Sequence, residues 1–215
     1  MNMGSVKCQI SISLDGFVAG PNQSIENPIG EGGIRLHEWA FQTEAWRRQQ
    51  GLTGGERTAD SDVIDEVVQD VGAYIMGRNM FGGGGGPWDE SWTGWWGEEP
   101  PYHAPVFVLS SHAREPLLMK GGTTFTFVSD GIESALQQAL AAGGGSDVAI
   151  AGGASVVQQY LKAGLLDELY LHMVPIVLGA GERLLADVGD PAFEPVQVIA
   201  SPSVTHIKYR VAHSV

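Results

Sequence analysis

The chain has 215 residues, of which 43% are hydrophobic and 17% are charged, so it can fold around a sizeable apolar core and is not a disordered chain. Its formal net charge of −13 argues against nucleic acid and anionic membrane surfaces as partners, because both require a basic face on the protein. A small anionic ligand is compatible with this charge only where a few cations and backbone N–H groups gather.

The cysteine content and the N-terminal residues indicate in which cellular compartment the protein resides. The single cysteine, Cys8, excludes a disulfide within one chain and favours a reducing environment. It lies in an apolar run, so we expect a small core residue rather than a nucleophile. No run approaches the roughly 20 apolar residues of a membrane span. Residues 1–6 lack the pattern of a secretory signal, so we predict a cytoplasmic protein.

The chain begins with a strand and a long loop. Residues 8–14 alternate between apolar and polar side chains, which is the pattern of a β-strand. Asp15 and Gly16 end this strand, and a glycine-rich loop continues to Gly33. The loop either closes over a ligand or is simply a mobile connection.

Two helices are predicted next. Residues 34–50 place apolar side chains on one side of a helix. Residues 59–71 have an apolar stripe typical of a second helix. Its N-cap is predicted among three polar residues, Asp60, Ser61 and Asp62.

A cation follows the next predicted strand. Residues 73–76 form a short apolar run that ends at Gly77, and Arg78 begins another predicted helix. A guanidinium at this position suits phosphate neutralisation. The alternative is an ordinary arginine exposed to solvent.

Residues 82–104 are rich in glycine and tryptophan and cannot form regular structure. Five consecutive glycines precede four tryptophans, at positions 88, 92, 95 and 96. Exposing so many indole rings is unfavourable, so we expect them to pack on the protein's own body or on a second subunit. The alternative is that they form a wall of a substrate pocket.

Polar residues follow the middle strand of the chain. Residues 105–109 are almost continuously apolar, as in the centre of a parallel sheet, and Ser110, Ser111 and His112 come directly after them. Residues 125–128 predict another strand, followed by a helix to residue 142 that Ser129 or Asp130 caps.

The stretch from Val148 to Leu161 reads as a strand, two glycines and a helix. Gly152 and Gly153 allow a sharp bend and a close approach of ligand to backbone. The first turn of a helix leaves N–H groups unpaired at its positive end, so the stretch is a candidate phosphate site. The alternative is a turn that binds nothing.

The order of elements predicts the architecture. Strands alternate with helices up to residue 161, which favours a mostly parallel sheet. Residues 168–174 form another strand, and residues 195–200 and 204–212 read as an antiparallel hairpin at the end of the chain. Ligands of such sheets bind at the carboxyl ends of the strands, so the polar and glycine-rich turns predict one shared nucleotide site.

Several runs resemble one family. Residues 75–79, 108–111 and 151–161 resemble the Met-Gly-Arg, Leu-Ser-Ser and glycine-rich runs of dihydrofolate reductases. Residues 13–16 and 166–181 are more similar to the reductase domain of bifunctional riboflavin-biosynthesis deaminase-reductases. The resemblance implies an α/β, three-layer dihydrofolate reductase-like domain over residues 1–215. It also implies NADPH as cofactor and a homodimer. No zinc-deaminase signature accompanies it, so we expect the reductase half alone.

The resemblance also implies which residues bind the cofactor. Phosphates would lie at Gly77, Arg78 and Asn79, and the 2′-phosphate at Ser110, Ser111 and His112. The pyrophosphate would lie at Gly152, Gly153, Ala154, Ser155 and Val156, with Gln159 near the adenine. The nicotinamide would lie beside Val18, Ala19 and Gly20. Two departures from the folate enzymes, at Ala154 and Ser155, and the absence of their first-helix motif weigh against folate as substrate.

Two carboxylates are candidate catalytic residues. Asp15 lies at the carboxyl end of a strand, where it can orient substrate or handle a proton, although a role as turn former competes. Glu38 is the carboxylate nearest to the position that binds the pterin in folate enzymes, and its alternative is an exposed helix residue. The six histidines show no paired metal spacing, so we predict no metal.

Three functions compete on these grounds. The first is an NADPH-dependent reductase of a small heterocyclic or carbonyl substrate, such as a pterin or a ribosylaminopyrimidine. The second is a module or sensor that binds NADPH without turnover. The third, which has the weakest support, is an interaction protein stabilised by its tryptophan-rich loop.

Overall fold

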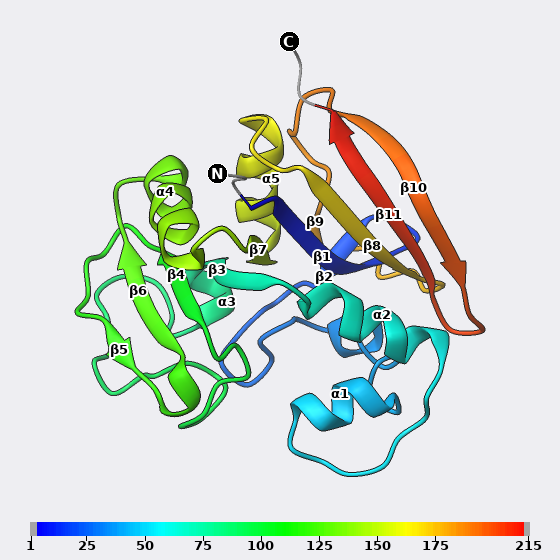
Figure 1. Cartoon of the computed structure of the whole chain (residues 1–215), viewed down its shortest axis with the longest axis horizontal. Helices are drawn as coiled ribbons and strands as arrows, with labels where there is room; N and C mark the ends of the chain where they lie inside the picture. The colour runs from blue at the N-terminus through cyan, green and yellow to red at the C-terminus, as the bar shows by residue number, and fades with distance from the viewer. Residues whose placement is uncertain (1–3, 213–215) are drawn as a thin grey trace.

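A nine-stranded sheet dominates the computed structural model, which describes residues 4–212 (Figure 1). Its strands are ordered β10-β11-β8-β1-β7-β3-β4-β6-β5 in the described residues. Six strands run in parallel: β1 (Val6–Ser13), β3 (Val71–Gly77), β4 (Pro105–Leu109), β6 (Thr124–Val128), β7 (Asp147–Gly152) and β8 (Glu168–Val174). The predicted mostly parallel sheet is therefore confirmed.

The antiparallel strands lie at the two edges. β10 (Ala192–Ala200) and β11 (Thr205–Ala212) form the predicted hairpin, and β11 joins it to β8. β5 (Leu117–Leu118) pairs with β6 at the opposite edge. A separate two-stranded pairing joins β2 (Phe17–Ala19) to β9 (Glu182–Arg183), which the sequence pattern did not predict.

Helices cover both faces of the sheet and make three layers (Figure 1). α4 (Ile132–Gly143) and α5 (Ala154–Lys162) pack on one face, while α1 (Glu44–Gln49) and α2 (Ala59–Val68) lie on the other. The single-turn α3 (Arg78–Phe81) follows β3, and two 3₁₀ turns complete the set, η1 (Gly33–Leu36) and η2 (Lys120–Gly122). No helix within residues 4–212 is long and apolar enough to cross a bilayer.

Three predicted helices differ from those in the structure. The predicted helix 34–50 is broken, because the buried Thr43 hydroxyl donates to Ala40 O (2.6 Å) and accepts from Trp46 N, so that it caps α1. The predicted helix 59–71 is capped by Thr58 instead of Asp60, Ser61 or Asp62, and ends at Val68. α4 has Gly131 at its N-cap in place of Ser129 or Asp130.

The core contains Cys8, as predicted. Its thiol is 2% exposed, and burial raises its pKa to about 12, so the thiolate that would act as a nucleophile does not form. The tryptophan-rich loop packs on the protein's own body, with Trp88, Trp92 and Trp96 against the core cluster of Phe81 and Phe125.

Indole groups of this loop also complete α3. A helix of one turn leaves its last carbonyl groups without intrahelical donors. Trp95 Nε1 donates to Met80 O (2.9 Å), and Trp92 Nε1 donates to Phe81 O (3.0 Å). The loop therefore fixes the short helix that carries Arg78.

The loop after β2 is closed on itself by backbone contacts. Gly20 N donates to Ile29 O (2.9 Å), and Glu31 N donates to Pro21 O (2.8 Å). A Cβ at Gly20 would lie 2.0 Å from Glu31 O, so the close approach of the two backbone segments requires glycine there.

Replacing Gly20 by alanine should therefore force the ends of this loop apart and lower the free energy of unfolding by about 1–3 kcal/mol. Urea unfolding measures the effect. Gly85→Ala is the matched control, since a Cβ at Gly85 meets nothing within 4 Å. Equal midpoints for the two variants would show that the loop ends are not in contact.

Candidate functional site

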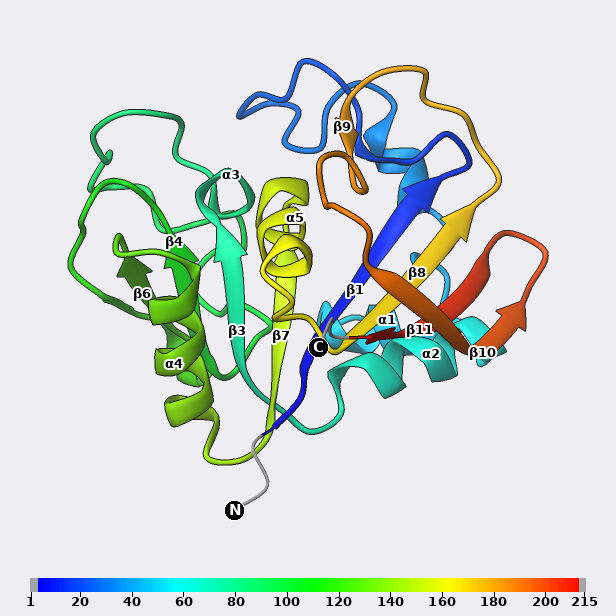
Figure 2. The ribbon, with the colours of Figure 1, turned by 90° about the horizontal axis from the view of Figure 1, so that it is seen from above.

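The predicted turns meet at one edge of the sheet. Figure 2 shows the arrowheads of β1, β3 and β8 at the same edge, with α3 at the tip of β3. β7 and β3 are neighbours, and a Cβ built on Gly77 would lie 3.8 Å from Gly153 N and 3.9 Å from Gly152 O. The two strand–glycine–helix junctions are therefore side by side.

The turn between β7 and α5 presents backbone to this edge. The Gly152–Gly153 peptide is cis, Gly152 has φ +133°, and Gly153 caps α5 without a side-chain hydrogen bond. A Cβ on Gly153 would meet nothing within 4 Å, so open space lies beside it. Ala154 and Val156 are buried, and Val156 N donates to Gly153 O (3.1 Å), so the Val156 N–H is not available to a ligand at this turn.

Arg78 is the most unusual side chain of the site. Its guanidinium lies over the Trp88 ring, with Cζ 3.7 Å from the ring centroid. Nε and Nη2 are buried and have no hydrogen-bond partner among the described residues. Desolvation, and secondarily the positive charge of Arg114, lowers the pKa of Arg78.

Arg114, which the sequence analysis did not single out, lies on the same tryptophan. Its Cζ is 5.3 Å from the Trp88 centroid, and its Nη1 is buried without a partner in the described chain. Nε and Nη2 bind the side chain and backbone of Glu90 at 3.3 and 2.9 Å. Its one sequence signal is that it is the first cation after β4, two residues beyond His112.

The turn after β4 completes this group. Ser110 Oγ accepts from His112 N and donates to His112 O, both at 3.1 Å, while Ser111 Oγ lies 3.1 Å from His112 Nδ1. Trp88 Nε1 donates to His112 O (2.9 Å). Trp88 therefore joins the predicted 110–112 turn to both arginines.

Other predicted cofactor residues lie further from this group. Val18 belongs to the same core cluster as Ala154 and Val156, and Ala19 and Gly20 continue from it into the clamped loop. The exposed Gln159 amide donates back to Ser155 O (3.0 Å) on the outer surface of α5. Within residues 4–212, neither segment makes a hydrogen bond, ion pair or ring contact with Trp88, Arg78 or Arg114.

The candidate catalytic carboxylates have different surroundings. Asp15 accepts hydrogen bonds from Ser13 Oγ (2.6 Å), Leu178 N (3.1 Å) and Gly179 N (2.7 Å). These bonds, the one from Ser13 first, lower the pKa of Asp15 to about 2. Asp15 is therefore ionised near neutral pH and ties the end of β1 to the β8–β9 connection, which favours the turn-forming interpretation. Glu38 is exposed.

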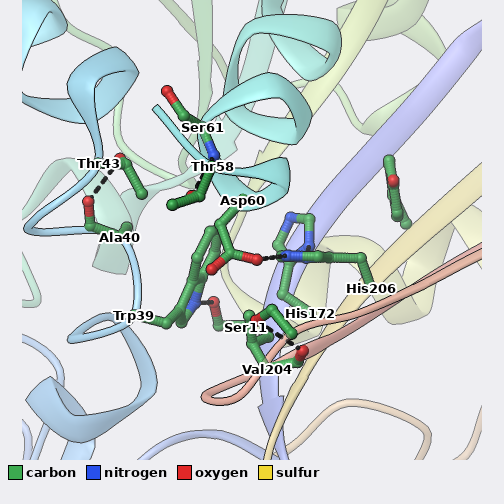
Figure 3. Close-up of polar contacts among 12 residues, drawn as sticks. Ser11, Trp39, Ala40, Thr43, Thr58, Asp60, Ser61, His172, Val204 and His206 are labelled. Atoms are coloured by element: carbon green, nitrogen blue, oxygen red, sulfur yellow. Dashed lines mark hydrogen bonds and ion pairs between the residues drawn. The ribbon is translucent and has the colours of Figure 1, made fainter. Parts of the chain in front are cut away.

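A chain of polar side chains, buried at Asp60, His172 and His206, crosses the sheet beneath α2 (Figure 3). His172 Nε2 lies 2.8 Å from Gln9 Oε1, His172 Nδ1 lies 2.8 Å from His206 Nδ1, and His206 Nε2 lies 2.9 Å from Asp60 Oδ1. Trp39 packs on both imidazoles, with centroids 5.1 and 5.0 Å away. From the sequence these histidines look scattered, and Asp60 is one of three candidate caps.

The hydrogen bonds constrain the hydrogens of this chain. The Asp60 carboxylate oxygen accepts, so His206 donates from Nε2, and one further hydrogen serves the bond between the two Nδ1 atoms. Desolvation by burial, then the neighbouring His206, lowers the pKa of His172, because its cationic form would be buried there.

The sequence as a whole identifies the family. Residues 5–207 match the sequence model of the RibD C-terminal domain. The chain belongs to this family. It is a reductase-type family of oxidoreductases, in agreement with the resemblance found from individual runs. The chain is also 37% identical to YyaP of Bacillus subtilis (strain 168) over 62 residues. These residues make up 29% of this chain and 32% of YyaP.

Solved structures share the fold. A protein of Shewanella sp. PV-4 named for riboflavin biosynthesis has 22% identity and a TM-score of 0.63, with 97% of this chain and 99% of that chain covered. Dihydrofolate reductase of Enterococcus faecalis, solved with NADP(H), has 13% identity and a TM-score of 0.55 over 98% of each chain. The deaminase and 5-amino-6-(5-phosphoribosylamino)uracil reductase of Thermotoga maritima has 15% identity and a TM-score of 0.56, with 98% of this chain but 57% of that chain covered.

The lowered pKa of His172 predicts acid sensitivity of this RibD C-terminal domain. The unfolded histidine takes up a proton below about pH 6.5 and the folded one does not, so stability falls as the pH drops below that value, by up to about 1.4 kcal/mol per pH unit. Urea unfolding between pH 7 and pH 5 measures the slope. His172→Gln should flatten it, while His103→Gln, at an exposed histidine, should not. The same slope in all three proteins would show that His172 is not responsible.

Proposed function

We propose that the protein is an NADPH-dependent reductase that transfers a hydride to a small heterocyclic or carbonyl substrate. Membership of the RibD C-terminal family supports the assignment of this protein as a reductase-type oxidoreductase. The observation that carries the choice of cofactor is the pair Arg78 and Arg114, which both lie at the Trp88 ring and each have buried N–H groups without partners in the described residues.

A phosphate group fits these unpaired donors. Burying a guanidinium N–H without an acceptor costs free energy, which an oxyanion at the same place would recover. Arginine forks bind phosphate oxygens through parallel hydrogen bonds. NADPH differs from NADH by one phosphate on the adenosine ribose, so the two cations favour NADPH. The hydroxyls of Ser110 and Ser111 lie at the same turn and would add neutral donors.

The glycine turn fits the pyrophosphate. Val156 N and Val157 N donate to Gly153 O, and the uncapped start of α5 with the open space at Gly153 would let the N–H groups that precede Val156 face an anion. Gly77 lies against this turn, so the two phosphate-binding segments would hold one dinucleotide between them. NADPH would supply the hydride, and the chain would place it, with Val18, Ala19 and Gly20 beside the nicotinamide.

The proton of the reduction is proposed to come from solvent. Asp15 is ionised through its three hydrogen bonds and serves to hold the loop around β9. Pterins and ribosylaminopyrimidines are the substrate types that the family suggests. The low pKa of Asp15 and the exposure of Glu38 also favour a second candidate, a module that binds NADPH without turnover. Oxidation of NADPH with a panel of such compounds separates the two.

Binding of NADPH tests the proposal directly. At about 100 times its dissociation constant NADPH should stabilise the fold by ~2.7 kcal/mol and raise the melting temperature by a few degrees. NADH and ATP should raise it less. Arg78→Ala should weaken NADPH binding about tenfold or more, since a charge-assisted hydrogen bond contributes about 1.5–3 kcal/mol.

The control for this variant is Arg48→Ala, which removes an exposed arginine paired with Asp65 far from Trp88 in the chain. It should keep the full NADPH effect. Unchanged NADPH affinity in Arg78→Ala would remove Arg78 from the site.

A homodimer is also proposed. β10 is an edge strand of the sheet, and Val196 and Val198 on it are 45% and 61% exposed. Edge strands present unpaired backbone groups that a second copy can cover. Light scattering at micromolar concentration should give the mass of two chains, and Val198→Glu should reduce it. A single-chain mass for the unaltered protein contradicts the dimer.

A further inference from the structure

The Trp88 ring contacts both arginines that have unpaired N–H groups. Cζ of Arg78 lies 3.7 Å from the ring centroid, and Cζ of Arg114 lies 5.3 Å from it. Both distances are within the range of a cation–π interaction, for which tryptophan is the strongest partner among the aromatic side chains. The ring therefore contacts two charged groups as well as the apolar core beneath its loop.

The two arginines are held in different ways. Arg114 donates from Nη2 to Glu90 O (2.9 Å) and from Nε to Glu90 Oε2 (3.3 Å), and its side chain is 1% exposed. Arg78 lacks such an anchor, because within residues 4–212 its Nε and Nη2 have no hydrogen-bond partner and its guanidinium lies over Trp88. A long side chain that is free to rotate loses conformational entropy when a ligand fixes it. The contact with Trp88 is thus what keeps the Arg78 guanidinium in place before a ligand binds.

The Trp88 ring is itself fixed by several contacts. Nε1 donates to His112 O (2.9 Å). The ring also meets Phe81 and Phe127 edge to face, with centroids 5.8 and 5.0 Å away. An indole whose N–H is bonded and whose ring packs on two others has little freedom to turn. It can therefore hold a guanidinium at a defined place beside the turn of residues 110–112.

Two guanidinium groups at one ring repel each other. Desolvation, and then the positive charge of Arg114, lowers the pKa of Arg78, so the two cations are close enough to interact. Without the ring, repulsion and hydration would favour rotamers of Arg78 that point into water. The electron-rich face of the indole offsets part of this repulsion. Two cations can then stay at one place, which suits a phosphate monoester, whose charge is about −2 near neutral pH.

We propose that Trp88 is the positioning residue that sets the preference of this protein for a 2′-phosphorylated dinucleotide over the unphosphorylated one. It acts through Arg78, because it holds that guanidinium at the same ring as Arg114 before the ligand binds. A phosphate monoester then meets two cations that are already in place, so its binding costs less conformational entropy. The inference rests on the proposed function, in which NADPH is the cofactor.

Titration calorimetry of the full chain with NADP⁺ and NAD⁺ measures this preference, since the two ligands differ only in the 2′-phosphate. The ratio of their dissociation constants should fall about tenfold in Trp88→Leu, while NAD⁺ binds with nearly unchanged affinity. Trp88→Phe should keep most of the preference, because phenylalanine retains an aromatic face although it loses the bond to His112 O. A wild-type ratio in a folded Trp88→Leu overturns the inference, and so does an equal loss in the two variants.

Trp96→Leu is the matched control, because Trp96 belongs to the same loop and packs on the same core cluster. Its ring stacks on Phe125 with centroids 5.9 Å apart and meets Tyr102 edge to face at 5.1 Å. Trp96→Leu should lower the stability of the fold but leave the NADP⁺ preference unchanged. An equal fall of the ratio in Trp96→Leu would assign the effect to the packing of the whole loop and overturn the inference.

A double-mutant cycle tests whether Trp88 acts through Arg78. In Arg78→Ala the guanidinium that the ring positions is gone, so adding Trp88→Leu should lower the ratio by no more than about threefold further. A further loss of about tenfold would show that Trp88 acts independently of Arg78, which contradicts the inference.

Failure of the proposed function gives a different result. A wild-type protein that binds NADP⁺ no better than NAD⁺, or binds neither, rejects NADPH as the cofactor and this inference with it. A wild-type preference for NADP⁺ that Trp88→Leu retains overturns the role of Trp88 alone and leaves the proposed reductase.

Discussion

The stacking of the Arg78 guanidinium on Trp88 connects most of the features at the carboxyl edge of the sheet. Two of its N–H groups are buried without an acceptor, a state that folding alone does not favour. Arg114 also lies at the Trp88 ring, and the Trp88 indole N–H donates to His112 O in the turn after β4. The tryptophan-rich loop, which carries Trp88, is held in turn by the α3 carbonyl groups. An anion at this place would satisfy donors that three separate segments bring together.

Charge is distributed unequally around this edge. The net charge of −13 excludes a generally basic surface, yet the guanidinium groups of Arg78 and Arg114 both lie at one aromatic ring. A local pair of cations of this kind would let an acidic protein bind a phosphorylated ligand.

A separate set of hydrogen bonds connects the sheet to α2. The chain from Gln9 through His172 and His206 to Asp60 joins the sheet to α2 through hydrogen bonds. Breaking it would leave buried polar groups without partners, so the chain specifies the position of α2. The sequence predicts Asp60 as a candidate cap of α2, but its side chain binds His206, which lies 146 residues further along the chain.

Local patterns in the sequence determined the strands of the main sheet other than β5. They also determined the glycine turns at Gly77 and Gly152 and the position of Arg78 beside one of them, because periodicity and glycine act over a few residues. They also supported a nucleotide site, since parallel strands bring their carboxyl ends to one edge. Only the tertiary structure decided that Arg114 joins Arg78, that His172 meets His206, and that Thr43 interrupts the predicted helix 34–50. Each of these depends on which segments distant in sequence become neighbours, and a buried polar group takes its role from the partner that folding places beside it.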